Sequence, residues 1–312
     1  MNGEPLNQLR DQLDPGACRL ANQPGRIWLF GGTGEFRLGT SGPCASLRES
    51  FWRQSLSCAP LRERDWTKDL DIPEQHPGWW AFSGYDNLLT FERDACHLAR
   101  AIVLFPESPG SLAELGALAV DDSIVNRLLV IVQSKYLDAE NRESFLNLGP
   151  LKRVDALKNR CVIGTKLSRD LPEDDFETVM EFVHDRLPSM PSTERLRLDA
   201  PTHKLLLISD LVDLLLISKP AELHGALQHF GVSITPQDLE RAAKLLEFFG
   251  LIRIEHRGSE HFFVRREKVN RTWVNYAAKD GKPAFDRSRF KLDRIALLNG
   301  NRRLMSVLER TE

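Results

Sequence analysis

Short apolar runs separated by longer amphipathic stretches characterise the first 187 residues of the chain. The runs at 27–30, 101–105, 128–132 and 161–164 have the length, and mostly the β-branched content, of buried parallel strands. The segment 70–74 is a further candidate strand. Apolar residues at helical spacing lie between these runs, for example over 85–100 and 175–187. Strands that alternate with helices predict a Rossmann-like, doubly wound parallel α/β sheet over residues 26–187.

The pattern changes after residues 188–203, which are rich in Pro, Ser and Thr and which we interpret as a linker. Beyond it, apolar residues recur at helical spacing. They predict one helix over 205–217, a second over 220–230, and a third that begins at Thr235-Pro236 and ends at Gly250.

Two further apolar runs flank Arg257-Gly258-Ser259 and predict a hairpin. Three helices followed by a hairpin describe a winged helix-turn-helix domain over 204–270. Residues 1–25 are polar and interrupted by Pro and Gly, which predicts an N-terminal arm. Residues 271–312 are rich in Lys and Arg, which predicts a basic C-terminal helical tail.

The net charge of −2 conceals an uneven distribution of charge. From Leu251 onward, Lys and Arg outnumber Asp and Glu, and such an asymmetry indicates a polyanionic partner. A winged helix commonly inserts its third helix into a nucleic-acid groove. A solvated basic surface and a protein-binding winged helix are the alternatives. The residues that we expect to contact nucleic acid are Arg241, Lys244, Arg257, Arg265 and Arg266.

Composition excludes several classes of protein. The 312 residues are 42% hydrophobic and 28% charged, which is typical of a globular protein with two domains. No apolar run approaches the roughly 18 residues of a membrane span, and the first residues do not resemble a signal peptide. We therefore expect a cytoplasmic protein without a membrane contact. The five cysteines show no ligand spacing, so the sequence predicts neither disulfides nor a metal site.

The turn after the run at 101–105 is the first candidate for chemistry, because ligands of open α/β sheets bind outside the carboxyl ends of the strands. Glu107 and Glu114 follow this run. Two helix starts fit the sequence. In one, Ser111 and Glu114 form a capping box; in the other, Ser108 is the N-cap and Pro109 the first helical residue. Glu92, on the preceding helix, is expected on a solvated face.

Glycines follow the first predicted strand, at Gly31 and Gly32. Such residues allow the backbone to turn tightly and to approach a ribose or phosphate closely. Together with Ser108, Gly110 and Ser111 of the central turn, they are the expected substrate-binding residues.

At IVLFPESPGSLAELGA, residues 102–117, the chain resembles the effector proteins of type II-A retrons, which carry a nucleoside deoxyribosyltransferase-like domain and a C-terminal winged helix. The resemblance includes NLLTFERD, residues 87–94, and the two glycines after the first strand. It implies an N-glycosidase that cleaves the bond between C1′ of a ribose and its base. In nucleoside deoxyribosyltransferases the motif ends in a nucleophilic Glu followed by Leu and Gly, and Glu114 matches that residue.

Nucleoside deoxyribosyltransferases place an Asp six residues before the nucleophile, where this chain has Ser108. That departure removes a proton donor for the leaving base. Nicotinamide bound as a pyridinium departs as a neutral molecule, so we expect NAD, or a related nucleotide, as the substrate and no cofactor. Glu107 is expected to be a second catalytic residue that orients the ribose or activates water.

The resemblance also implies a setting in anti-phage defence. The partners would be a retron reverse transcriptase and its branched msDNA/msrRNA product. They would restrain a toxic enzyme until infection, in a higher-order assembly.

Two other functions fit parts of the sequence. One is a nucleotide-sensing transcriptional regulator with a winged helix, which would tolerate the change Glu114→Gln. The other is a phosphoribohydrolase of the lysine-decarboxylase-like Rossmann group, whose turn contains glycines and a Thr that are missing here.

Overall fold

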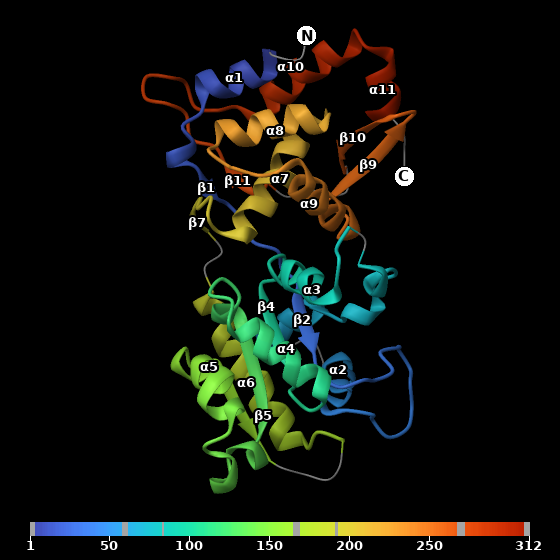
Figure 1. The fold of residues 1–312 in the computed structure, drawn as a ribbon, viewed down its shortest axis with the longest axis vertical. Helices are drawn as coiled ribbons and strands as arrows, with labels where there is room; N and C mark the ends of the chain where they lie inside the picture. Colours follow the sequence, from blue (N-terminus) through green and yellow to red (C-terminus); the bar gives the residue numbers. More distant parts are fainter. Residues whose placement is uncertain are drawn as a thin grey trace. The chain divides into compact units, whose positions relative to one another are not determined.

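The structure, a computed structural model, describes residues 4–57, 62–82, 84–164, 169–190, 193–266 and 272–308. The chain divides into two compact units. One comprises Pro24–Phe82 and Asp86–Pro191, and the other comprises Met1–Gln23, Ser83–Tyr85 and Ser192–Glu312 (Figure 1). We call them the α/β unit and the C-terminal unit.

The α/β unit is built on a parallel sheet, as the alternating pattern predicts. Among the described residues, five strands pair in the order β3-β2-β4-β5-β6. Their bounds are β2 (Ile27–Phe30), β3 (Leu70–Asp71), β4 (Ala101–Leu104), β5 (Leu128–Gln133) and β6 (Arg160–Ile163). The chain runs from β2 to the edge strand β3 and then crosses to β4, on the other side of β2. The strand order therefore reverses between β2 and β4, where sheets of this kind bind their ligands.

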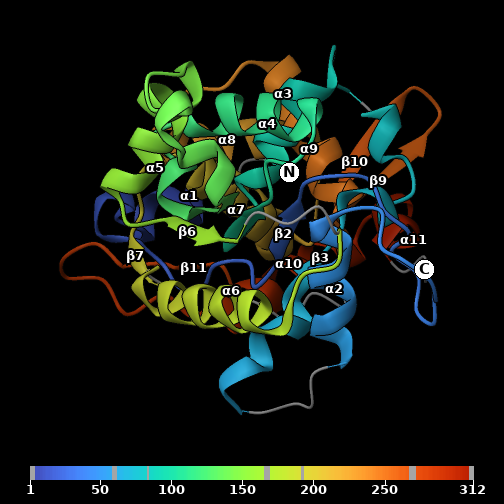
Figure 2. The ribbon, with the colours of Figure 1, turned by 90° about the horizontal axis from the view of Figure 1, so that it is seen from below.

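Helices cover both faces of this sheet (Figure 2). Helices α2 (Leu47–Ser57) and α6 (Glu173–Arg186) lie on one face, and α3 (Leu88–Cys96), α4 (Pro109–Ala119) and α5 (Lys152–Ala156) lie on the other. Alternate strand residues such as Leu29 and Val103 form a core with Phe51 of α2 and Phe176 of α6. Because both faces are covered, the central strands β2 and β4 are apolar throughout.

The C-terminal unit contains the predicted helices and the predicted hairpin. The helices are α7 (Pro201–Leu215), α8 (Pro220–His229) and α9 (Pro236–Phe248). The hairpin strands are β9 (Ile252–Arg257) and β10 (Glu260–Arg265). A short strand that the sequence did not predict, β8 (Ile217–Ser218), pairs with β10. Leu216, at φ 67°, turns the chain sharply from α7 into β8.

The segments that were expected as an arm and a tail both belong to the C-terminal unit. Helix α1 (Glu4–Gln12) packs on α8, and β1 (Arg19–Leu20) pairs with β7 (Glu194–Arg195) and β11 (Val274–Asn275). Helices α10 (Arg287–Asn299) and α11 (Arg302–Leu308) contribute Leu298 and Val307 to a core shared with β8 and β10. The last helices therefore complete this unit.

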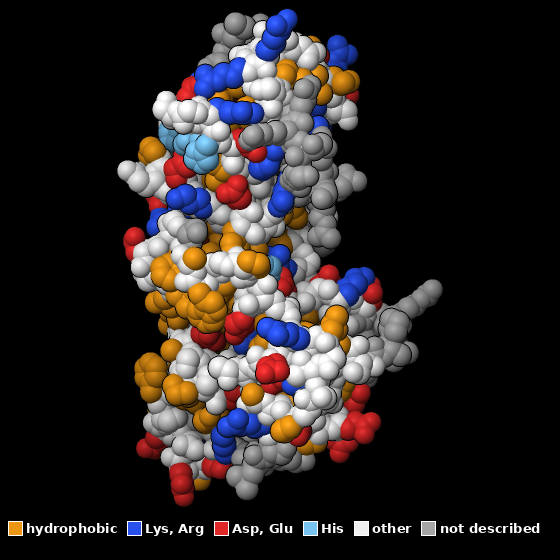
Figure 3. All heavy atoms as spheres, turned by 90° about the vertical axis from the view of Figure 1, so that its right-hand side faces the viewer, with side chains coloured by type: hydrophobic (Ala, Val, Ile, Leu, Met, Phe, Trp, Pro, Cys, Tyr) orange, Lys and Arg blue, Asp and Glu red, His pale blue; other side chains and the backbone are white. Residues whose placement is uncertain are grey.

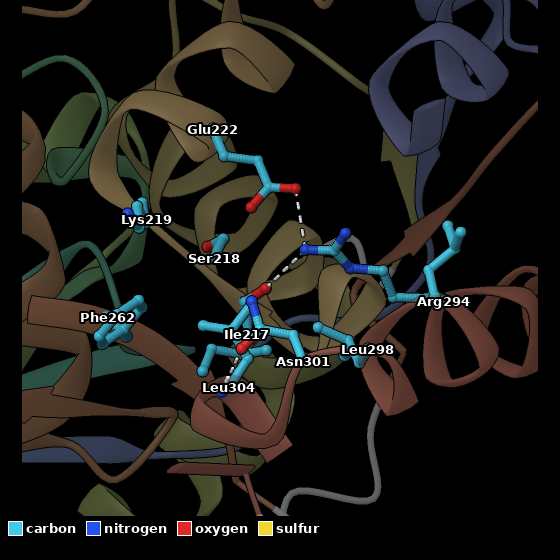
Figure 4. Close-up of a pocket in the computed structure, with 10 residues that line it drawn as sticks. Ile217, Ser218, Lys219, Glu222, Phe262, Arg294, Leu298, Asn301 and Leu304 are labelled. Atoms are coloured by element: carbon cyan, nitrogen blue, oxygen red, sulfur yellow. Dashed lines mark hydrogen bonds and ion pairs between the residues drawn. The ribbon is translucent and has the colours of Figure 1, made fainter. Parts of the chain in front are cut away.

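Arg294 fastens α10 to the rest of the unit. Its guanidinium donates to the carbonyl oxygens of Leu215 (3.1 Å) and Ile217 (3.0 Å) and to the carboxylate of Glu222 (2.8 Å). Figure 4 shows the contacts with Ile217 and Glu222 at the edge of a cavity of about 160 Å³, which is lined by apolar residues and by polar ones such as Ser218 and Asn301. Arg294 is only 7% exposed, so its charge serves the fold rather than a polyanion.

Candidate active site

The helix that carries Glu114 begins at the earlier of the two predicted starts. Ser108 is the N-cap of α4 and accepts a hydrogen bond from the Ser111 amide (3.1 Å), and Pro109 is the first helical residue. This confirms the second alternative. Glu114 consequently lies in the second turn of α4, where its carboxylate is not needed as a cap.

Ser111 closes the turn between β4 and α4. Its hydroxyl accepts from the amides of Glu107 (3.0 Å) and Ser108 (2.9 Å), and its side chain is almost fully buried. The Ser108 hydroxyl lies 3.0 Å from that of Ser111. The structure therefore gives both serines, expected to bind substrate, a role in shaping the turn. Gly110 is exposed in the first turn of α4.

Glu107 fastens this turn to the neighbouring glycine loop and to α2. Its Oε1 accepts from the amides of Gly32 (3.2 Å) and Arg48 (3.0 Å), and its Oε2 accepts from the amide of Leu47 (2.8 Å). Helix N-termini favour a negative charge, and these bonds use both carboxylate oxygens. Glu107 was expected to act on the substrate, and in the structure its carboxylate accepts the amides that begin α2 and the amide of Gly32.

The glycines after β2 allow the glycine loop to lie close to Glu107 and to the start of α2. A Cβ on Gly32 would lie 2.8 Å from Cβ of Ser46 and 3.1 Å from Cδ of Glu107. Gly31 adopts φ 152°, which side chains rarely tolerate, and a Cβ there would crowd Arg48 and Phe105 at 3.0 and 3.1 Å. The two glycines lie at the carboxyl edge of the sheet, as expected, and their contacts are with the protein itself.

Arg48 is a buried cation that the sequence did not single out. It is 2% exposed and donates to both oxygens of Glu74 (2.8 and 2.6 Å) and to the carbonyl of Gly32 (3.2 Å). Burial acts to raise the pKa of Glu74, and the hydrogen bonds and charge of Arg48 outweigh it, so this pKa lies below its ordinary value. A bidentate pair of this kind is geometrically rigid.

Glu92 is half-buried and its carboxylate is hydrogen-bonded within the protein, which differs from the solvated face that was expected. Its Oε1 accepts from Nε1 of Trp79 (3.2 Å). Trp79 is itself 1% exposed, with its ring 5.2 Å from Trp28 and 4.9 Å from Phe91 between ring centroids. Burial is the main reason that the pKa of Glu92 is raised to about 7, and the charge of Glu74 adds to it while Trp79 and Arg48 act against it.

Glu114 shares this environment. Its Oε2 is buried and has no hydrogen-bond partner among the residues that the structure describes. Burial first, and then the negative charge of Glu92, raise the pKa of Glu114 to about 8, against the opposing charge of Arg48. Buried carboxylates with strongly raised pKa values cluster at catalytic sites. Glu114, Glu92, Glu74 and Arg48 therefore form what we call the carboxylate cluster.

The carboxylate cluster suits chemistry in which positive charge develops on a substrate. An ionised carboxylate in a dry environment stabilises such charge strongly, and it can also form a covalent bond to the electron-poor carbon. Cys96, one turn after Glu92, is fully buried with its pKa well above the ordinary value, mainly through burial, which makes it unreactive. No group of His, Cys, Asp and Glu suited to a metal ion is found in the described part of the chain.

The residues expected to contact nucleic acid do not form one cluster. Lys244 is exposed on α9, whereas Arg241 forms an ion pair with Asp238 on the same helix. Arg257 pairs in register with Glu260 at the turn of the hairpin, and Arg265 lies at the opposite end of β10, roughly 17 Å away at about 3.3 Å per residue. Arg266 follows it.

Lys and Arg side chains also alternate with Asp, Glu and His on the face of the C-terminal unit shown in Figure 3. Several basic side chains of this unit are ion-paired: Arg287 pairs with Asp210 and Asp213, and Arg303 pairs with Glu260. Of the basic residues late in the chain, Lys268, Arg271 and Arg310 lie outside the described residues. Each described helix is too short or too polar to cross a membrane.

Comparison with known proteins agrees with the resemblance at residues 102–117. A family model described as STM3845 retron effector protein matches residues 44–254. The "Retron Ec86 putative ribosyltransferase/DNA-binding protein" of Escherichia coli is 31% identical over 115 residues, which are 36% of this chain and 35% of that protein. The corresponding Ec73 protein of Escherichia coli is 38% identical over 69 residues, or 22% of this chain and 21% of that protein. The alignments thus span about a third and a fifth of these relatives.

Proposed function

This chain belongs to the family of STM3845 retron effector proteins, and from that premise we propose that its α/β unit is an N-glycosidase with Glu114 as the carboxylate at C1′. The observation that carries the proposal is the position of Glu114. It follows the central strand at the switch point of the sheet, it is not used as a cap, and its buried Oε2 has no partner among the described residues. Cleavage of a glycosidic bond passes through an oxocarbenium-like transition state, which such a carboxylate stabilises.

We propose NAD, or a related nucleotide, as the substrate. The carboxylate cluster contains Glu74, Glu92 and Glu114 against the cation of Arg48, so a pyridinium would enter a site of opposite charge. Nicotinamide leaves such a bond as a neutral molecule and needs no proton donor. The names of both relatives include ribosyltransferase, which agrees with chemistry at C1′ of a ribose in a nucleoside deoxyribosyltransferase-like fold.

For the C-terminal unit we propose a winged helix-turn-helix that holds the nucleic acid of a retron. Helices α7, α8 and α9, with the sheet β8-β10-β9, have the order of elements typical of that domain. Exposed Lys244 on α9 would contact phosphates. In this proposal a reverse transcriptase and its msDNA/msrRNA restrain a toxic enzyme until phage infection, within a higher-order assembly.

The test of the proposed activity is the release of free nicotinamide from NAD by the purified protein, alone and with its reverse transcriptase and msDNA. The measurement belongs at a pH near 8 or above, where Glu114 is substantially ionised. We expect release that disappears in Glu114→Gln and persists in Glu181→Gln, the same substitution at an exposed position on α6 of the same unit.

Other outcomes would redirect the proposal. If NAD is left intact but purine or pyrimidine nucleotides are cleaved in a Glu114-dependent manner, the activity stands and the substrate changes. If no base is released from any of these compounds in any state, and NAD binds equally well to Glu114→Gln, the glycosidase is refuted and the nucleotide sensor takes its place.

A further inference from the structure

Glu107 and Glu92 are both candidates for the second carboxylate that acts on the substrate. Their hydrogen bonds differ. Both oxygens of Glu107 accept backbone amides of Gly32, Leu47 and Arg48. A carboxylate held in that way cannot rotate towards a substrate without leaving buried amides unpaired. Among the described residues, Glu92 accepts no backbone amide, and its Oε1 accepts a hydrogen bond from Nε1 of Trp79.

We propose that Glu92 is the acid–base partner of Glu114. It would have the role of second catalytic carboxylate that we expected of Glu107 from the sequence. The inference rests on the proposed function, because it names the proton carrier for that reaction. It goes beyond the family resemblance, in which this part of α3 supplies only a stretch of similar sequence.

The position of Glu92 is built into the fold. It lies on α3 one turn before the fully buried Cys96, and residues four apart share a helix face. Helix α3 packs against α4, which carries Glu114. Trp79 holds the Glu92 carboxylate from the other side, and its ring is fixed by Trp28 and Phe91. The Glu92 carboxylate is therefore held on a helix that packs against the helix of Glu114, and it is close enough for its charge to act on Glu114.

The charges around Glu92 and Glu114 determine how many protons these two carboxyl groups bind. The titratable and charged groups that act on Glu92 and Glu114 are Glu74 and Arg48, and Cys96 lies beside them. Arg48 already neutralises Glu74 through two hydrogen bonds. Ionising both Glu92 and Glu114 therefore places two uncompensated charges close together, and one proton is retained until the pH is raised.

In the proposed reaction, Glu92 would transfer a proton in the second of two steps. With a pyridinium substrate, the Glu114 carboxylate forms a bond to C1′ while the C1′–N bond breaks and its electron pair leaves with neutral nicotinamide. Water then attacks C1′, Glu92 takes the proton of that water, and Glu114 departs as a carboxylate. Glu92 finally releases the proton to solvent, so hydrolysis of the cationic substrate yields one proton overall. With a neutral base, protonated Glu92 would instead donate to the leaving nitrogen.

The two substrate classes therefore predict different pH profiles. Cleavage of a pyridinium substrate requires both carboxylates ionised and rises with pH through the range from about 7 to about 8. Cleavage of a nucleotide with a neutral base requires one proton on the pair, so its rate passes through a maximum and falls again.

The experiment compares Glu92→Gln, Glu107→Gln and Glu181→Gln with the wild type. In Glu92→Gln, whose amide oxygen can still accept from Trp79, we expect kcat for base release to fall about 10²-fold or more. The remaining rise with pH should move to lower pH, because a charge that opposes ionisation of Glu114 is gone. Glu107→Gln should lower the unfolding temperature through lost caps, and its folded fraction should keep the wild-type pH profile. Glu181→Gln should match the wild type in both respects.

A second readout tests the pair without any turnover. Infrared difference spectra across the pH range follow the loss of the carboxylic-acid band as Glu114 ionises. In Glu92→Gln this loss should occur at lower pH than in the wild type. If the wild type releases no base, the proposed function fails while an observed shift still supports the coupled pair. Unchanged kcat in Glu92→Gln, or an unshifted titration of Glu114, would overturn the inference.

Discussion

Replacing Glu114 by Gln should remove activity and at the same time stabilise the α/β unit at neutral and alkaline pH. The reason is the raised pKa of this carboxyl, which burial and the charge of Glu92 move from an ordinary 4.5 to about 8. The folded protein binds this proton more tightly than the unfolded chain does. The contribution of Glu114 to stability is therefore fully present below pH 4.5 and is lost progressively as the pH rises through the folded-state pKa.

The size of the effect follows from that shift. Each pKa unit corresponds to about 1.36 kcal/mol, so a change from 4.5 to about 8 sets an upper limit of roughly 5 kcal/mol above pH 8. Glu92 titrates in the same range and shares the proton. We therefore expect a gain of about 2–3 kcal/mol for Glu114→Gln near pH 8, and almost none near pH 4.5. For a unit of this size that is roughly 5–10 °C in unfolding temperature.

Tryptophan fluorescence makes this measurement specific to the α/β unit. Of the six tryptophans, Trp28, Trp52, Trp66, Trp79 and Trp80 belong to that unit and only Trp273 to the other. Thermal unfolding of the wild type, Glu114→Gln and Glu181→Gln would be followed at a series of pH values. The wild type should lose stability from acid to alkaline pH, and Glu114→Gln should lose much less. A variant that is less stable than the wild type at pH 8, or that differs by the same amount at every pH, would refute this reasoning.

Two further predictions concern the contacts that shape each unit. Gly32→Ala should destabilise the α/β unit by about 1–3 kcal/mol, because its Cβ would lie 2.8 Å from that of Ser46 and 3.1 Å from Cδ of Glu107. A denaturation midpoint equal to that of Gly116→Ala, at a glycine of α4 with open space around it, would contradict this. Arg294→Leu should destabilise the C-terminal unit by about 3–5 kcal/mol, because it leaves the carboxylate of Glu222 without its buried partner. The double variant with Glu222→Gln should recover part of that loss in the same unfolding experiment, and recovery of none would count against the pairing as the cause.

Much of the fold was determined by local sequence. Apolar runs of strand length gave the parallel sheet, because a strand covered on both faces must be apolar along its whole length. Asn87 and Ser108 begin α3 and α4 as N-caps, and a cap depends only on residues within one turn. The position of Glu114 after the central strand was likewise visible, because the turn follows the strand directly. The family match confirms the resemblance read from residues 102–117.

The composition of the carboxylate cluster was decided by the tertiary structure. The sequence around Glu107 and around Glu92 is compatible with a solvated side chain and with a functional one. The carboxylate of Glu107 accepts hydrogen bonds from the amides that begin α2, about 60 residues earlier in the chain. The carboxylate of Glu92 accepts a hydrogen bond from the indole N–H of Trp79, whose ring packs against Trp28.

The basic end of the chain shows the same division. A count of Lys and Arg after Leu251 indicates a polyanion partner, but it cannot tell which charges already have partners. Arg287 and Arg294 pair with Asp210 and Glu222, residues more than 70 positions away. The sequence by itself therefore determined the elements and the central turn, whose interactions are local. Which charged side chains are free to act was decided only by the tertiary structure, because a carboxylate or guanidinium is committed by groups that the fold brings to it from distant parts of the chain.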